Sequence, residues 1–161
     1  SQAERERAEK EKKARIVIRE AVMEDAAAIA EMEHQIFADA WSEKSVLDTI
    51  NQKNTICLAA EKAGRLVGYL LAYAAADEAE IARIAVTEEF QRQGAGRALI
   101  LGLETVCEEN KIEKLLLDVR ESNETARTFY AEMGFQEDGI RQRFYENPQE
   151  DGILMSRELG K

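Results

Sequence analysis

Hydrophobic and polar positions along the chain predict alternating strands and helices between residues 15 and 159. Apolar residues that alternate with polar ones, or that gather in short β-branched and aromatic runs, indicate strands. Apolar residues that recur every three or four positions indicate amphipathic helices. In chain order, these patterns predict a strand at 15–19, helices at 21–37 and 42–52, strands at 55–61, 66–75 and 80–86, a helix that ends near residue 110, a strand at 114–119, a helix at 123–133, and strands at 135–145 and 151–159.

Residues with turn or capping properties separate these elements. Asp25 lies near the start of the first helix, and Ser42 can cap the second. Residues 62–65, Lys-Ala-Gly-Arg, are a hairpin signal between two strands, and Gly134 ends the last helix. The resulting order predicts an α/β (α+β) fold, in which a mixed central sheet of about seven strands is flanked on both faces by about four helices.

Residues 1–13 differ from the rest of the chain, because they contain no aliphatic side chain larger than alanine and are rich in Glu, Lys and Arg. A segment that cannot bury apolar surface does not join a core. We therefore expect residues 1–13 to be a charged N-terminal extension, either a solvated helix or disordered. Residues 14–161 are expected to form a single domain, because a chain of this length supports one sizeable core.

The composition indicates in which cellular compartment the protein works and whether it binds a metal. Hydrophobic residues make up 45% of the chain, but no apolar run approaches the roughly 20 residues that span a membrane, and the charged N-terminus has no signal-peptide pattern. Cys57 and Cys107 lie in apolar patterns without CxxC spacing, which is typical of reduced core thiols in a cytoplasmic protein. The single histidine, His34, is expected to be solvated on the polar side of its helix. One histidine and two scattered cysteines are too few ligands for a metal site, so we expect none.

The net charge of −10 constrains the partners. Nucleic-acid contacts need clustered Lys and Arg, so this charge argues against nucleic acid as a general partner. It favours a cationic acceptor that the overall field attracts. We expect a cytoplasmic monomer or weak dimer that acts on a positively charged molecule, with no membrane partner.

The segment Gln91-Arg92-Gln93-Gly94-Ala95-Gly96-Arg97 lies between a predicted strand and a predicted amphipathic helix. Two glycines at the start of a helix let the backbone approach a ligand without interference from Cβ atoms. The first N–H groups of the helix have no internal partner, and the helix dipole places partial positive charge there. Together with the two arginines, this arrangement predicts a phosphate-binding loop.

Other interpretations of the glycines fit less well. A Walker loop requires GxxxxGK followed by Ser or Thr, and the chain contains no such string. A dinucleotide-binding loop needs a third small residue where this chain has Leu99, and its first glycine follows the strand directly, whereas here residues 87–93 intervene. Asp118 does lie about where the ribose-binding acid of such a fold is found. This alternative and a ligand-free glycine turn both stay open.

The element order and the pattern Gln91-x-x-Gly94-x-Gly96 resemble the GNAT acetyltransferases, which use acetyl-CoA, over about residues 15–159. The resemblance implies the GNAT fold. Further motifs resemble the RimI type, whose members acetylate the α-amino group of a bacterial small-subunit ribosomal protein. These motifs are Trp41-Ser42-Glu43-Lys44, Ile84-Ala85-Val86, Phe90-Gln91-Arg92-Gln93-Gly94-Ala95-Gly96-Arg97-Ala98-Leu99, Asp118-Val119-Arg120-x-Ser122-Asn123, Phe129-Tyr130-x-x-x-Gly134-Phe135, Phe144-Tyr145 and Asp151-Gly152-Ile153-Leu154-Met155.

The resemblance implies a role for each matching residue. Tyr130 would be the general acid, and Asp118 stands where the family has a glutamate as general base, so the base departs from the family pattern. Acetyl-CoA would be held by strand-type backbone bonds for its acetyl and pantetheine part, by the glycine loop for its pyrophosphate, and by an asparagine for its pantetheine arm. In that order, these residues are Ile84, Ala85 and Val86; Arg92, Gln93, Gly94, Ala95, Gly96 and Arg97; and Asn123.

Acyl transfer from a thioester to an amine needs a neutral amine, a stabilised oxyanion and a protonated leaving group. An α-amino group with a pKa of about 8 is already roughly one-tenth neutral at pH 7, whereas a lysine with a pKa of about 10.4 is neutral only about once in 2,500. A carboxylate that works through water, such as Asp118, can therefore serve an N-terminal acceptor. Tyr130 can protonate the thiolate, and backbone N–H groups of residues 84–86 can stabilise the oxyanion.

Each of these side chains has a second interpretation. Tyr130 lies on the apolar face of its helix and can be a core residue, Asp118 can be a strand-end acid bonded to backbone N–H groups, and Asn123 can be a helix N-cap. Glu80 is a second candidate for the general base. Trp41 is expected to anchor packing, not to react.

The residues and the resemblance together predict an acetyl-CoA-dependent acetyltransferase that acts on the α-amino group of a basic protein N-terminus. The expected acceptor is the N-terminal alanine of a bacterial small-subunit ribosomal protein. Within the same fold, the alternative is a lysine or small-amine acetyltransferase. From another class, the alternative is a non-catalytic acyl-CoA-binding module that keeps the loop but has lost the base.

Overall fold

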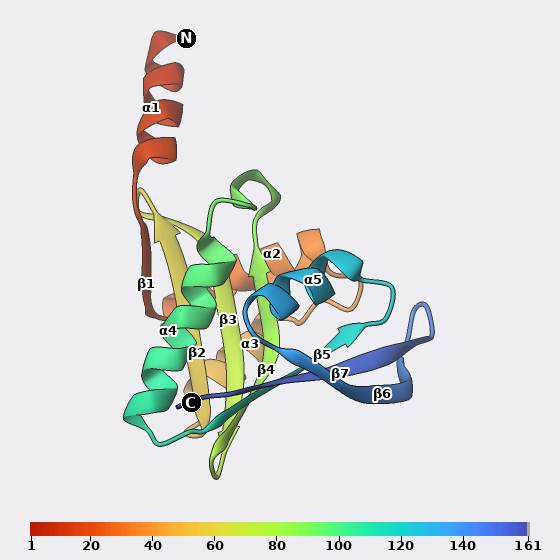
Figure 1. Cartoon of the computed structure of the whole chain (residues 1–161). Helices are drawn as coiled ribbons and strands as arrows, with labels where there is room; N and C mark the ends of the chain where they lie inside the picture. The colour runs from red at the N-terminus through yellow and green to blue at the C-terminus, as the bar shows by residue number, and fades with distance from the viewer. Residues whose placement is uncertain (161) are drawn as a thin grey trace.

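The computed structural model describes residues 1–160 and is built around one seven-stranded sheet (Figure 1). The strands lie in the order β1-β2-β3-β4-β5-β7-β6, and neighbouring strands are antiparallel except β4 and β5, which are parallel. This mixed sheet confirms the predicted fold class. In chain order the strands are β1 (Ile16–Glu20), β2 (Thr55–Lys62), β3 (Arg65–Ala75), β4 (Glu78–Val86), β5 (Lys114–Arg120), β6 (Gln136–Tyr145) and β7 (Glu150–Glu158).

The α-helices of the described residues are α1 (Gln2–Lys13), α2 (Ala26–Ile36), α3 (Glu43–Asn51), α4 (Ala95–Glu109) and α5 (Glu124–Glu132). The predicted cap of α3 is confirmed, because the Ser42 hydroxyl accepts the backbone N–H of Ser45 at 3.1 Å. The helix predicted at 21–37 begins only at Ala26, after a 3-10 turn at Met23–Asp25. The reason is local: Oδ2 of Asp25 accepts the backbone N–H of Val22 at 2.8 Å and fixes that turn.

The helices cover both faces of the sheet, as the element order predicts. In Figure 1, α4 crosses the face formed by β1 to β4, and Leu99 and Leu103 are fully buried there. α5 contributes to the same apolar cluster. α2 and α3 lie on the opposite face, where Ile29, Val46 and Tyr69 are fully buried in a second cluster. The central strands therefore carry an apolar core on each side.

The two parallel strands stay together over only part of their length. β4 pairs with β5 from Glu78 to Ile81, and the last pair is Ile81 with Leu117. On its other side, β4 pairs with β3 through a bulge, because Leu71 faces Arg83 while Ala72 faces Ile81 and leaves Ala82 as the extra residue. A bulge bends its strand. Beyond it the two strands diverge, as Figure 1 shows, and the sheet opens.

α1 extends away from the sheet at the N-terminal end of β1 (Figure 1). Ser1 and Glu4 form a capping box at its start, and residues 1–10 are exposed. The predicted boundary between residues 13 and 14 stays a prediction, and Lys161, the last residue of the predicted domain, lies outside the described residues. Within residues 1–160, no helix combines the length and the apolar character that crossing a membrane requires.

Candidate active site

A cleft of about 660 Å³ lies where β4 and β5 diverge. Its walls come from residues 80–84 of β4, residues 117–120 of β5, α5 together with its N-cap residue, the segment after α2, and residues 144–147 at the end of β6. The cleft brings together four of the predicted site residues and the alternative base. These are Ile84, Asp118, Asn123, Tyr130 and Glu80.

The backbone of β4 has free hydrogen-bonding groups on the side where β5 has departed. Thr87 donates its N–H to Val67 at 2.9 Å, so the antiparallel register makes Ala85 the next residue bonded to β3. The groups of Ile84 and Val86 then point to the open side, and the Val86 carbonyl there accepts from Nε2 of Gln91 at 3.0 Å. Ligand-directed backbone bonds therefore suit Ile84 and Val86. The backbone groups of Ala85 are directed to β3, and its side chain is buried in the α2–α3 core.

The glycine loop has the geometry of an anion site. Gly94 is the N-cap residue of α4 in a left-handed conformation, with φ +91°, and no atom lies within 4 Å of the place a Cβ would take. The N–H groups of residues 93–97 donate to no acceptor among the described residues. Arg92 and Arg97 are exposed beside them. The loop lies next to the cleft lining and not within it.

Gly96 has a packing role that the sequence did not indicate. A Cβ at this position would lie 3.3 Å from Cζ of Phe129. The missing side chain therefore lets α5 pack closely against the first turn of α4. This contact places the helix that carries Tyr130 next to the glycine loop.

Lys62 lies beneath the loop and was not expected from the sequence. It is buried, and its Nζ donates to Oε1 of Gln93 at 2.7 Å. Nζ also lies 5.7 Å from the centre of the Phe90 ring. The contact spans 31 residues of sequence. No local pattern could have linked the end of β2 to this loop.

Tyr130 is both a core residue and a residue of the cleft. It is buried, and its ring meets Phe129 and Phe135 edge-on, with ring centres 5.2 and 5.6 Å apart. Within residues 1–160, its hydroxyl makes no hydrogen bond. Burial raises the pKa of the Tyr130 phenol above its ordinary value. At neutral pH the group therefore keeps its proton and can donate it.

Asp118 points into the cleft with an ion-pair partner that the sequence did not reveal. Oδ1 of Asp118 lies 2.8 Å from Nε of Arg141, which reaches it from β6. Burial raises the pKa of the Asp118 carboxyl, and Arg141 opposes that rise. No backbone N–H among the described residues binds Asp118, so the alternative of a strand-end acid held by backbone groups is wrong. Glu80 is exposed on β4 and lines the same cleft.

Asn123 is the predicted N-cap of α5. Its Oδ1 accepts the backbone N–H of Ala126 at 3.1 Å. Its amide N–H₂ group donates to no partner within the described part of the chain. Because the oxygen caps the helix and the residue lines the cleft, the amide donors are available to a ligand.

A buried polar cluster supports the segment between α2 and α3. Glu33 is fully buried and accepts from Arg83 of β4, from the hydroxyl of Tyr69 and from the backbone N–H of Trp41. The Arg83 guanidinium also lies over the Phe37 ring, 4.2 Å from its centre. Trp41 packs against the α2–α3 core, as expected of a packing anchor.

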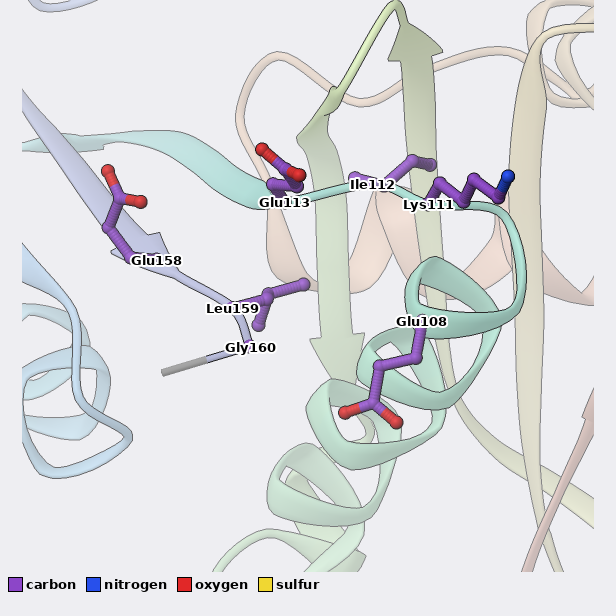
Figure 2. Close-up of a pocket in the computed structure, with 7 residues that line it drawn as sticks. All are labelled: Glu108, Lys111, Ile112, Glu113, Glu158, Leu159 and Gly160. Carbon is purple, nitrogen blue, oxygen red and sulfur yellow. The ribbon is translucent and has the colours of Figure 1, made fainter.

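A second hollow, of about 480 Å³, lies at the end of the sheet where α4, β5 and β7 meet (Figure 2). Its labelled residues include the acidic side chains of Glu108, Glu113 and Glu158 around Ile112 and Leu159. None of the predicted site residues lines it. Over residues 1–160, no group of three or more His, Cys, Asp or Glu residues is arranged to hold a metal ion.

This chain is similar to known proteins in sequence and in fold. The acetyltransferase (GNAT) family matches residues 26–135. The ribosomal protein bS18-alanine N-acetyltransferase of Escherichia coli (strain K12) is 32% identical over 134 residues, which are 82% of this chain and 90% of that protein. The crystal structure of the ribosomal-protein-S18-alanine N-acetyltransferase from Escherichia coli matches with a TM-score of 0.84 at 30% identity, over 91% of this chain and 96% of that chain. Arabidopsis thaliana NAA60 in complex with acetyl-CoA shares the fold, with a TM-score of 0.81 at 18% identity over 90% of this chain and 99% of that chain.

Proposed function

This chain belongs to the acetyltransferase (GNAT) family and is an N-acetyltransferase, and we propose that it transfers the acetyl group of acetyl-CoA to the α-amino group of a basic protein N-terminus. The acceptor that we propose is the N-terminal alanine of a bS18-type ribosomal protein, the acceptor named for the Escherichia coli relative. The observation that supports this function most is the divergence of β4 and β5, with Ile84, Asp118 and Tyr130 lining one cleft.

The start of α4 supports the binding of acetyl-CoA through its pyrophosphate. The unpaired N–H groups of residues 93–97, the helix dipole and the side chains of Arg92 and Arg97 all favour an anion at this position. The pantetheine arm then runs along the open side of β4, toward the backbone groups of Ile84 and Val86. The amide of Asn123 binds the arm from the opposite wall.

Asp118 and Tyr130 supply the proton transfers in this proposal. Asp118 accepts the proton that the amine loses, through an ordered water, and Tyr130 donates its proton to the departing thiolate. The N–H group of Ile84 stabilises the negative charge that develops on the carbonyl oxygen. The leaving thiolate, whose conjugate thiol has a pKa of about 8.5, is a stronger base than water. A neutral phenol within reach can therefore protonate it as it leaves.

Carboxylates around the cleft support a positively charged acceptor. Asp39, Glu80 and Glu146 line it, and the chain as a whole carries a net charge of −10. Arg83 and Arg120, which also line the cleft, are paired with Glu33 and Glu150, and Arg83 lies 3.6 Å from Asp39 as well. The acidic side chains therefore attract the basic residues that follow the reacting amine.

Thiol release tests the function with three acceptors: a basic peptide that begins with Ala, the same peptide with a blocked N-terminus, and a polyamine. We expect release only with the free N-terminus, and mass spectrometry should locate the acetyl group on the α-nitrogen. Label on lysine side chains, or faster turnover of the polyamine, would identify a lysine or small-amine acetyltransferase. Binding of acetyl-CoA without turnover of any amine would identify a non-catalytic binding module.

A further inference from the structure

Arg141 reaches Asp118 across an intervening strand. The two residues lie in β6 and β5, and β7 runs between them with Gly152 opposite Arg141 and Leu154 opposite Asp118. Gly152 leaves the space above β7 to side chains of β6, because a Cβ there would lie 3.2 Å from Cδ2 of Phe144. The long guanidinium arm can therefore cross β7 and bring its Nε to 2.8 Å from Oδ1 of Asp118.

The two members of this ion pair are held very differently. The side chain of Asp118 is 11% exposed, whereas that of Arg141 is 50% exposed. Among the described residues, Asp118 is the single ionic partner of Arg141, whose guanidinium otherwise lies over the Phe144 ring at 5.5 Å. Arg120 offers a contrast, because Glu150 and the carbonyl of Glu146 both hold it. Arg141 is therefore the exposed partner of this ion pair, and Asp118 is the largely buried one.

We propose that Arg141 and the acceptor amine are alternative partners of Asp118, so that the ammonium group of the acceptor displaces the guanidinium on entering the cleft. This inference rests on the proposed function. A carboxylate with so little exposure needs a cation beside it, and a terminal ammonium supplies one. Phe144 lines the cleft and offers the displaced guanidinium an aromatic surface. Arg141 is thus a positioning residue that keeps Asp118 ionised until the acceptor arrives.

The proposal makes acceptor binding a cation exchange, and its pH dependence follows from the charges around Asp118. The charged or titratable groups that line the cleft with it are Asp39, Glu80, Arg83, Tyr130, Tyr145 and Glu146, in addition to the paired Arg120. Burial raises the pKa of Tyr145 to about 12, so this phenol is neutral at physiological pH. Because Arg83 and Arg120 have acidic partners of their own, Arg141 is the cation on which the charge of Asp118 depends.

The test measures kcat/KM and KM for the basic peptide against pH in wild type, Arg141→Gln and Arg141→Lys. Arg141→Gln removes a positive charge from Asp118, so its pKa rises and the acid limb of the profile moves up by about one pH unit, which lowers kcat/KM below the limb about tenfold. Above the limb, KM for the peptide falls by about 1.5- to 5-fold, because no guanidinium competes for the carboxylate. Arg141→Lys keeps the limb near its wild-type position.

Arg143→Gln is the matched control, because it removes the same charge from the same strand. Arg143 forms no ion pair within the described residues. An unmoved acid limb in Arg141→Gln, or a peptide KM that is unchanged or higher, overturns the exchange. Wild-type use of the free and blocked peptides separately decides the proposed function. If wild type prefers another amine, the same profiles are measured with that amine. If it turns over no amine, a carbon NMR titration of Asp118 in wild type and in Arg141→Gln decides whether Arg141 controls the charge of Asp118.

Discussion

Arg83 and Glu33 form an ion pair beneath the segment that borders the cleft between α2 and α3. Nη2 of Arg83 lies 2.6 Å from Oε1 of Glu33, whose side chain is fully buried. Glu33 also accepts the backbone N–H of Trp41 at 3.0 Å, and Arg83 stacks on Phe37. One guanidinium thus ties residues 37–41 to β4, the strand that carries the open backbone groups of the cleft.

Arg83→Lys should weaken acceptor binding without weakening acetyl-CoA binding. Lysine keeps the charge but lacks the planar fork and the stacking surface, so residues 37–41 lose their fixed position. We expect a higher KM for the peptide and an unchanged Kd for acetyl-CoA by calorimetry. Arg83→Met should lower the free energy of unfolding by about 3–5 kcal/mol, because it leaves Glu33 buried without its cation. Arg127→Lys, at an ion pair outside the cleft, is the control, and an effect on acetyl-CoA alone would contradict this prediction.

Gly94→Glu should weaken acetyl-CoA binding far more than folding. The variant places bulk and negative charge where the pyrophosphate is proposed to lie, at the positive end of α4. Gly64→Glu is the matched control, because Gly64 also has a positive φ, +76°, and open space around it, in the hairpin between β2 and β3. Both variants carry a similar backbone strain, so comparing them isolates the ligand effect. Equal acetyl-CoA affinity of the two folded variants in calorimetry would remove the pyrophosphate from this loop.

Tyr130→Phe should lower kcat by roughly 10²- to 10⁴-fold, the range typical of acid–base catalysis. The ring contacts with Phe129 and Phe135 are kept, so the melting temperature and the acetyl-CoA affinity should stay near wild type. Tyr73→Phe is the control, because it removes a hydroxyl that contacts Thr49 outside the cleft. Single-turnover measurements separate chemistry from product release. A wild-type rate for the chemical step would return Tyr130 to a packing role alone.

Asp118→Asn should depress the rate most at low pH, where neutral amine is scarce. Asp118→Glu restores the longer side chain of the family and should keep or raise activity. Glu80→Gln decides between the two candidate bases: if it cripples turnover while Asp118→Asn is silent, the base is Glu80. Rates from about pH 6 to pH 9 cover the titration of an α-amine.

Asp118→Asn should also change the stability of the protein in a pH-dependent way. Burial raises the pKa of Asp118, so the folded chain binds this proton more tightly than the unfolded chain. The contribution of the group to stability is therefore present at low pH and falls as pH rises through the folded pKa. Asp118→Asn removes that fall, so its melting temperature relative to wild type should be higher at about pH 7 than at about pH 3. A difference with the opposite sign would mean that Arg141 outweighs burial.

Local patterns were sufficient to predict most of the fold. Apolar alternation and short apolar runs located the strands to within about two residues, including β6, which is exposed over almost its whole length. Gly94 marked the start of α4, since a positive φ favours glycine. Ser42 and Asn123 were recognised as caps because capping involves only residues three positions away. The first helix was predicted to begin too early, because the carboxylate of Asp25 bonds to Val22 as well as to Arg19.

Contacts between distant segments were beyond the reach of these patterns. Asp118 and Arg141, Lys62 and Gln93, and Glu33 and Arg83 are separated by 23 to 50 residues. The packing of Gly96 against Phe129 also depends on two helices that a strand separates. Spacing along the chain carries no information about such pairs. The sequence could therefore nominate Asp118 and Tyr130 but could not say which charges surround them.

The short pairing between β4 and β5 has a consequence for how Ile84 and Asp118, two residues of the proposed site, are positioned. Hydrogen bonds between the two strands end at Ile81 and Leu117, before Ile84 and Asp118. No backbone ladder joins these two arms, so their separation depends on how the surrounding side chains pack, among them Tyr130, which belongs to both the cleft and the apolar core. The relative positions of Ile84 and Asp118 therefore depend on how the side chains of the apolar core pack against one another. Repacking that core changes the width of the cleft even when every residue that lines it is kept.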